Sequence, residues 1–476
     1  MNAARQLCIY VTGLFLCGAA CGASYPVHRS AANPRLLVDQ NNAPFLMVGD
    51  SPQALLVNLS ASDTARFLAD RAAHGFNTLW VNLLCVGYTG GRADGSLLDG
   101  TKPFTQTLPG TSYYDLTTPN EAYFAHVDKV VRTAAADGIE LMLDPLETGG
   151  FLKTALGNGS ARCRGYGRYL GRRYKDSPNI IWLSGNDYQD WKVATNDAVT
   201  TAVALGIRDE DTNHLQTIEL NYQASSSLDD PNWAPIVGLN FAYTYHPTYA
   251  EVLHAYNQGI GVGPHFFRGS GGEVAEKDAG LTPMPVIMGE ANYEYETNGG
   301  TDGGRPLILR RQEYWTMLSG ASGQLYGNHY SWPFVAGWQS HIDSPGVVQL
   351  QYMVDLFRSR KWYELVPDQT HTFLTDGYGH FVSSGLLAGN DYVAAALTPD
   401  GALGMAYLPQ GGTITVAMNK LRNPVTARWF DPSANRFKTI PGSPFPNTGT
   451  RQFTAPGNNG DGDPDWVLVL EAPPRR

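Results

Sequence analysis

Two acidic side chains stand at the ends of short apolar runs and could do chemistry together. Asp187 follows the run Trp182–Gly185 through Asn186, and Glu290 closes the run Val286–Gly289. Cleavage of a glycosidic bond needs one carboxyl group that protonates the leaving oxygen and a second that attacks, or activates water, from the opposite side. A single acid in such a place is as often a helix cap or a loop anchor. Two of them together favour the catalytic interpretation.

Other polar and aromatic side chains occupy corresponding positions after apolar runs. Hydroxyl groups of a sugar need hydrogen bonds, and its apolar ring faces stack on aromatic rings, so these residues are predicted to bind substrate. They are Asp50, Asn82, Asp144, Asn186, Glu219, Tyr243, Tyr245, His246, His329 and Trp332. For three acids a second interpretation stays open: Asp50 as a helix N-cap, Asp144 as an anchor of the turn at Pro145, and Glu219 as a support of the main acids. Glu294 is expected to be exposed or to tie down a loop.

The elements that must position these residues alternate in type from residue 42 to residue 328. Short apolar runs are separated by longer amphipathic stretches, which predicts repeated βα units and a parallel sheet. The runs are Pro44–Gly49, Thr78–Leu84, Ile139–Asp144, Asn179–Gly185, Leu215–Asn221, Ile236–Tyr243, Pro285–Glu290 and Gly323–Asn328. Eight strands close a (β/α)₈ barrel, whose catalytic groups lie at the carboxyl ends of the strands. Strands four and seven, which carry Asp187 and Glu290, would then face each other across the mouth.

The intervening stretches have helical spacing. Ser62 is the expected N-cap of a first helix that ends at Gly75, a second helix is expected within 120–138, and a last barrel helix within 347–360. Beyond about residue 370 the helical period gives way to short alternating strands separated by Gly, Pro, Asn and Asp turns. We therefore expect a barrel domain over residues 24–370 and a small β-sandwich over residues 371–476.

The amino-terminal segment predicts export. Arg5, an apolar run from Leu7 to Ala20 and small residues before Ser24 are typical of a signal peptide cut after Ala23. The run is shorter than the roughly 20 residues that span a bilayer. Lipoprotein cleavage before Cys21 is an alternative, although the leucine usual ahead of such a cysteine is missing. A secreted or periplasmic location is expected in either case.

Charge and cysteine content narrow the class of partner. A net charge of −10 argues against nucleic acid or an anionic membrane as partner and favours a neutral or small-molecule one. The predicted sugar site makes an oligo- or polysaccharide the expected partner. Cys85 and Cys163 are the cysteines that remain after the leader, as a disulfide or as two free thiols. They do not make a metal site, and no cofactor is expected. The acidic stretch Asp461–Asp465 lacks the spacing of a calcium loop and is expected to be a turn. The oligomeric state is left open.

These motifs together resemble the apiosidase-like glycoside hydrolase family, whose barrel is followed by a small domain named for collagen binding. The resemblance covers nearly the whole mature chain. It rests on segments 48–50, 74–78, 178–182, 289–294, 320–323 and 326–329, and on 429–432 and 465–468 in the second domain. It implies an acid/base at Asp187 and a nucleophile at Glu290, acting by a retaining route on a furanoside or side chain of a plant-wall or microbial glycan.

Two segments depart from the family pattern. The first strand is followed by Asp50-Ser51-Pro52-Gln53 where the family usually has an aromatic residue after a Thr-Ala pair. The fourth strand is followed by Gly185-Asn186-Asp187 where Gly-Gly-Asp is common, and Asn186 before the acid is similar to the Asn-Glu pair of the wider barrel glycosidase clan. Both changes border the predicted sugar site, so the sugar itself is open.

Two other function classes would require different features of the sequence. A non-catalytic carbohydrate- or matrix-binding protein would not need opposed carboxyl groups, and inertness on a broad glycan panel would favour it. A metal-dependent barrel hydrolase would need a His-x-His on the first strand or a histidine cluster, and the sequence has neither.

Overall fold

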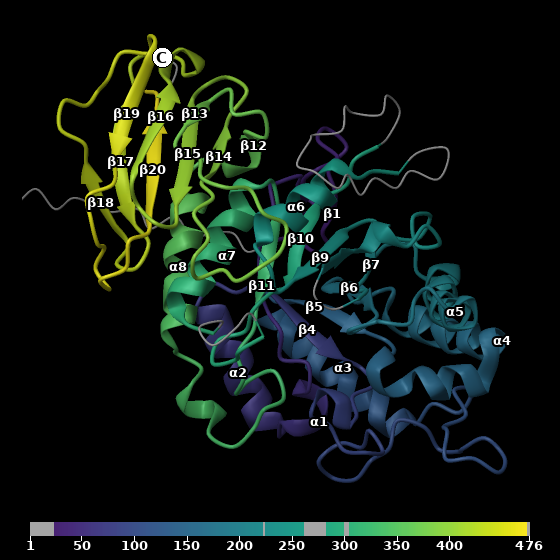
Figure 1. The fold of residues 1–476 in the computed structure, drawn as a ribbon. Helices are drawn as coiled ribbons and strands as arrows, with labels where there is room; N and C mark the ends of the chain where they lie inside the picture. The colour runs from purple at the N-terminus through teal and green to yellow at the C-terminus, as the bar shows by residue number, and fades with distance from the viewer. Residues whose placement is uncertain (1–22, 222–223, 261–281, 299–303, 474–476) are drawn as a thin grey trace, which may run out of the picture.

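The fold centres on one curled sheet with helices on its outer face (Figure 1). The computed structural model describes residues 23–221, 224–260, 282–298 and 304–473. Eight parallel strands of the sheet match the eight predicted runs. They are β3 (Met47–Asp50), β4 (Thr78–Asn82), β5 (Glu140–Asp144), β6 (Ile180–Ser184), β7 (Gln216–Ile218), β9 (Asn240–Thr244), β10 (Val286–Glu290) and β11 (Gly323–Tyr326).

The strand order is β7-β6-β5-β4-β3-β11-β10-β9-β8, with β8 (Ala224–Ser226) antiparallel to β9. Pairing of Asn82 with Asp144 brings the ends of β4 and β5 to one level, and pairing of Glu290 with Tyr243 does the same for β10 and β9. The described ladder has β7 and β8 as its ends, so the closed eight-stranded barrel is confirmed only as a curled nine-stranded sheet. Asp50, Asn82, Asp144 and Glu290 are each the last residue of a strand at its carboxyl edge.

Alternation along each strand explains both faces of the sheet. Leu79 and Val81 pack outward among the helices, whereas Trp80 packs inward against Met142, Ile181 and Phe241. The inward side chains fill the space enclosed by the curled sheet, so the interior is a packed hydrophobic core and not a pore. The short hairpin of β1 (His28–Arg29) and β2 (Leu37–Val38) contributes Leu37 to this core.

The helices follow their strands as expected. They are α1 (Leu55–Asn58), α2 (Ala61–Ala73), α3 (Glu121–Ala136), α4 (Thr148–Tyr174), α5 (Ala194–Glu210), α6 (Thr248–Asn257), α7 (Pro306–Leu318) and α8 (Pro345–Arg358). The predicted N-cap Ser62 was wrong: the N-cap of α2 is Ser60, two residues earlier, and Ser60 accepts the Asp63 N–H. Asn120 caps α3 in the same way.

The carboxyl-terminal part forms two further sheets. One has the order β12-β14-β15-β20-β17-β18 and the other β13-β16-β19. Apolar alternation in the sequence predicts five strands, at 392–397, 404–407, 413–417, 426–430 and 466–470. They correspond to β14 (Ala394–Leu397), β15 (Leu403–Leu408), β16 (Thr413–Ala417), β17 (Thr426–Asp431) and β20 (Trp466–Glu471). The prediction missed β12 (Val366–Pro367), β13 (Leu374–Asp376), β18 (Arg436–Thr439) and β19 (Thr450–Thr454), which are short or exposed and carry no clear apolar alternation.

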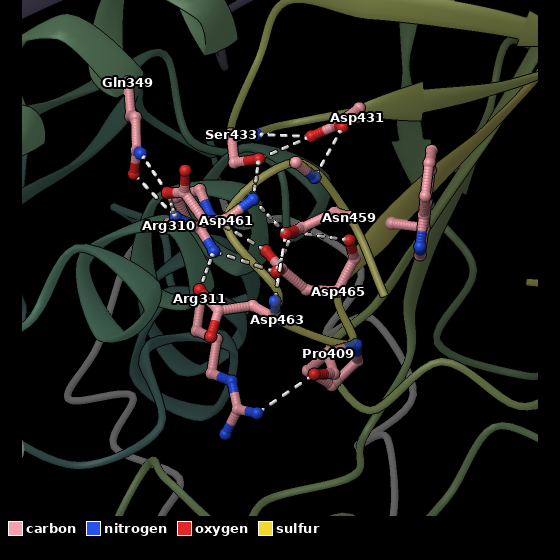
Figure 2. Close-up of polar contacts among 12 residues, drawn as sticks. Arg310, Arg311, Gln349, Pro409, Asp431, Ser433, Asn459, Asp461, Asp463 and Asp465 are labelled. Carbon is pink, nitrogen blue, oxygen red and sulfur yellow. Dashed lines mark hydrogen bonds and ion pairs between the residues drawn. The ribbon is translucent and has the colours of Figure 1, made fainter. Parts of the chain in front are cut away.

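A buried arginine fastens the β-sheets to the helices. Arg310 of α7 is fully buried and meets the acidic turn 461–465 (Figure 2): its Nη2 lies 2.7 Å from Asp463 and 3.0 Å from Asp465, and its Nη1 lies 3.4 Å from Asp461. Around this contact Tyr314 stacks on Tyr407 with ring centroids 5.0 Å apart. The expected acidic turn is therefore confirmed. Its carboxylates form ion pairs with the Arg310 side chain of α7.

Three expectations from the sequence concern export, membrane and cysteines. The predicted leader lies outside the described residues except for Ala23. Within the described part of the chain, none of the helices is long and apolar enough to cross a membrane. Cys85 and Cys163 are both buried free thiols, which selects the second of the two alternatives.

Candidate active site

Glu290 ends β10 with its carboxylate inside a ring of hydroxyl donors. Tyr245 donates to Oε1 at 2.6 Å, and Tyr293 donates to Oε2 at 2.9 Å. The residue is 6% exposed. Burial and the nearby charge of Asp187 raise the pKa of Glu290 to about 8, although the tyrosine hydrogen bonds pull it down. Both oxygens are thus oriented by donors that favour the ionised form.

Asp187 lies after β6 and is held in a similar way. Tyr243 donates to Oδ1 and Tyr88 donates to Oδ2, each at 2.7 Å. Its backbone N–H donates to Glu219 Oε2 at 2.9 Å. The carboxylate of Asp187 is therefore held by two phenols, and its backbone is held by Glu219.

Two tyrosines connect the two acids. Tyr243 lies in β9 and Tyr245 directly follows the end of that strand, and their hydroxyl groups are 3.0 Å apart. Tyr243 donates to Asp187 and Tyr245 donates to Glu290, so the two carboxylates are connected through a pair of phenols whose oxygens are in contact. Burial and the charge of Glu290 raise the pKa of both phenols, so they remain donors at neutral pH.

The turn that carries Asp187 is strained. Gly185, Asn186 and Asp187 have φ of 112°, 71° and 50°, all in the left-handed region. Such conformations cost about 1–3 kcal/mol for residues other than glycine and cluster at functional sites. A Cβ at Gly185 would meet the Glu219 carbonyl at 2.0 Å, so only glycine fits. Thr148 compensates by donating its hydroxyl to the carbonyl of Gly185 at 2.6 Å.

Additional buried acids support the site. Glu219 is 1% exposed, and its Oε1 has no hydrogen-bond partner among the described residues. Burial, then the charges of Glu290 and Asp187, raise the pKa of Glu219 well above its usual range. Asp144 accepts the Leu146 N–H at 2.9 Å, which matches the turn-anchoring interpretation. Burial also raises the pKa of Asp144 well above its usual range.

Two predicted sugar-binding residues are fully buried instead. Asp50 forms an ion pair with Arg71 at 3.3 Å and accepts the Ser51 N–H. The N-cap of α1 is Ala54, so the N-cap interpretation of Asp50 was wrong. Asn82 accepts from Trp80 Nε1 at 2.9 Å. Both side chains complete the packing beneath the site, because polar groups inside the sheet must find partners there.

The remaining predicted residues lie at the rim. Asn186 is 3% exposed and donates to Gln53 Oε1 at 3.2 Å. His329 and Trp332 both contact Glu296 Oε1, at 3.3 and 2.6 Å. His246 accepts the Gly385 N–H at 3.4 Å, a contact from the β-domain. Glu294 is buried and accepts the Gly346 N–H at 2.9 Å, so it ties the start of α8 to the site.

The sequence prediction missed several residues that the fold brings here. Tyr88 lies six residues after the end of β4, and its ring packs over Gly149, where a Cβ would lie 2.2 Å from it. Tyr293 stands three residues beyond Glu290, and Glu147 accepts the Val86 N–H at 2.9 Å. Glu296 contacts His329 and Trp332 at the rim of the site. Tyr293 and Glu296 lie close in sequence to Glu290, a signal that could have identified them, whereas Tyr88 depends on a loop path that no spacing rule gives.

Two groups of described side chains are close enough to hold a cation. They are Asp70, His74 and Asp343, and Asp229, Glu251 and His254. Neither group includes Asp187 or Glu290.

Comparisons with known proteins agree on the family. A model described as "Apiosidase-like, catalytic domain" matches residues 31–364, and one described as "Putative collagen-binding domain of a collagenase" matches residues 381–471. A search of curated proteins finds no match.

Solved structures share the fold over almost the whole chain. One named a glycoside hydrolase is 22% identical and has a TM-score of 0.73, over 95% of this chain and 98% of its own. A glycoside hydrolase family 5 structure from Bacteroides vulgatus is 20% identical with a TM-score of 0.72, over 94% of this chain and 93% of its own. With the catalytic-domain model covering most of its length, the chain belongs to the apiosidase-like family and is a glycoside hydrolase.

Proposed function

We propose that this glycoside hydrolase works by a retaining double displacement in which Glu290 is the nucleophile and Asp187 is the acid/base. The observation that carries the proposal is the pair of phenols between the two acids: Tyr243 donates to Asp187, Tyr245 donates to Glu290, and the two phenol oxygens are 3.0 Å apart. It holds two carboxylates at the edge of one sheet, each with its oxygens oriented by phenol donors.

The chemistry follows from the two positions. Asp187 gives a proton to the leaving oxygen while Glu290 attacks the anomeric carbon, which forms a covalent glycosyl-enzyme; Asp187 then takes a proton from the water that releases the sugar. Tyr245 and Tyr293 orient Glu290 for attack. Their hydrogen bonds also stabilise carboxylate charge when Glu290 leaves the sugar again.

The substrate class is a furanoside or side chain of a plant-wall or microbial glycan, as the family match suggests. His329 and Trp332 at the rim, and Tyr88 beside Asp187, are the side chains that we propose contact sugar. Tyr88 is 41% exposed while its hydroxyl stays on Asp187. The other predicted site residues position the two acids and the sugar-contacting side chains, as their buried hydrogen bonds suggest. They are Asn82, Asp144, Asn186, Glu219, Tyr243 and Tyr245.

The same proposal includes the architecture around the site. Closure of the sheet as a (β/α)₈ barrel is supported by the Gly238 N–H, which donates to the Gln216 carbonyl at 2.9 Å, and by Thr217 Oγ1, which donates to the Leu239 carbonyl at 2.7 Å. We also propose a domain boundary near residue 370 and export by the leader of residues 1–23.

A glycan panel tests the function. Purified protein is incubated with plant-wall and microbial polysaccharides and oligosaccharides, and released sugars are identified by chromatography and mass spectrometry. We expect at least one product that is absent with Glu290→Gln. Inertness of the wild type over the whole panel, or equal activity of the variant, would contradict the proposal.

A further inference from the structure

The segment between β13 and β14, residues 377–393, leaves the β-domain and lies against the helices of the catalytic domain (Figure 1). Tyr249 of α6 accepts from the Val382 N–H at 3.1 Å and from Asn390 Nδ2 at 3.0 Å. Arg311 of α7 donates to the Leu387 carbonyl at 2.5 Å. The segment is thus fastened at several backbone points.

These anchors place the segment at the catalytic end of the sheet. Helix α6 starts at Thr248, four residues after β9 ends, so Tyr249 in its first turn lies near the carboxyl ends of the strands. The Gly385 N–H reaches His246, which directly follows Tyr245, the donor to Glu290. The β-domain therefore extends to the neighbourhood of the nucleophile.

The outer surface of this segment is unusually apolar. Of the twelve large hydrophobic side chains exposed in the described residues, four lie within nine positions here: Tyr378, Phe381, Val382 and Leu386. Phe381 is 43% exposed, and its ring is held by Tyr249 at 5.0 Å and Tyr392 at 5.3 Å between centroids. A ring fixed by neighbours with one side open can stack on a sugar at little entropic cost.

We infer that residues 378–386 of the β-domain form a wall of the substrate cleft and bind a sugar unit of the same glycan, beyond the scissile bond. The inference rests on the proposed function. The contact of Gly385 with His246, which directly follows the Glu290 donor Tyr245, favours a carbohydrate chain as the occupant over a separate protein partner. The second domain then takes part in binding a long substrate while leaving the chemistry to Asp187 and Glu290.

The test compares Phe381→Ala and Leu386→Ser with Phe437→Ala. Phe437 is a matched control, because it is 41% exposed and lies on β18, the edge strand at the other end of the six-stranded sheet. On a polysaccharide that the wild type degrades, we expect the first two variants to raise KM roughly 5- to 10-fold with little change in kcat, in line with the loss of one stacking contact. Hydrolysis of a para-nitrophenyl monoglycoside should be unchanged in all three, and the loss of ring contacts should lower the thermal midpoint of Phe381→Ala and Phe437→Ala by similar amounts.

Equal KM values for Phe381→Ala, Leu386→Ser and Phe437→Ala would overturn the inference. So would a loss of binding to collagen with unchanged KM for the polysaccharide, which would make the segment a protein-docking surface. If the wild type hydrolyses none of the panel, the proposed function fails separately. Affinity electrophoresis in gels that contain each polysaccharide then decides the inference: retardation lost in Phe381→Ala supports it, and retardation equal in all variants refutes it.

Discussion

Replacing Glu290 by Gln should stop hydrolysis and also change how stability depends on pH. Burial and the charge of Asp187 raise the pKa of Glu290 from an ordinary 4.5 to about 8. In the unfolded chain the same carboxyl group releases its proton near pH 4.5. Because the folded state binds the proton more tightly, the free energy of unfolding falls as pH rises from 4.5 towards 8.

The magnitude follows from the two pKa values. A shift of one unit corresponds to about 1.36 kcal/mol, so this single group should cost the wild type about 3 kcal/mol of unfolding free energy between pH 5 and pH 7.5. Glutamine does not titrate, and the variant should lack this loss. Since an amide cannot form the glycosyl ester, turnover should fall by about three orders of magnitude or more.

Glu140 provides a matched control. It begins β5, at the opposite end of the sheet from the site, and its carboxylate has no hydrogen-bond partner among the described residues. Burial raises the pKa of Glu140 to about 8 as well. Glu140→Gln should therefore remove a similar pH dependence while hydrolysis continues.

The assay is urea unfolding followed by tryptophan fluorescence at several pH values, with initial rates measured on the same preparations. Full activity of Glu290→Gln would rule out its role as nucleophile. A pH dependence of stability that is unchanged in both variants would refute the argument from burial.

Three more outcomes follow. Asp187→Asn should fold normally, keep the Tyr243 and Tyr88 contacts through its amide oxygen and nitrogen, and lose turnover by about two orders of magnitude or more; wild-type rates would exclude Asp187 as acid/base. Proton NMR during hydrolysis should show the first product with retained anomeric configuration, and a sugar-bound structure should place the carboxyl groups roughly 5–6 Å apart; an inverted product, or about 6.5–9.5 Å, would assign inversion instead. Truncation after residue 370 should give an aggregating protein, because it removes the partners of Arg310 and uncovers Tyr314; a truncated chain that folds normally and loses only polymer binding would contradict this.

The sequence by itself determined the eight strands of the large sheet and the polar residues at their carboxyl ends. Eight apolar runs became eight parallel strands because buried parallel strands are continuous in hydrophobicity, and acids that follow them can only lie at the carboxyl edge. Asp187 and Glu290 could therefore be placed near each other without coordinates. The acidic turn 461–465 was likewise recognised as a turn from its composition.

Tertiary structure alone decided which polar residues face the site and which are buried below it with hydrogen-bond or ion-pair partners of their own. Asp50 was predicted to meet sugar, but Arg71, distant in sequence, lies against it; Asn82 is taken by Trp80. Conversely, Tyr88 reaches Asp187 by the path of its loop, and Gly385 reaches His246 from another domain. Periodicity describes contacts between near neighbours in the chain, whereas these partners are chosen by how separate elements pack, because a buried polar group must find its hydrogen bonds wherever the fold supplies them.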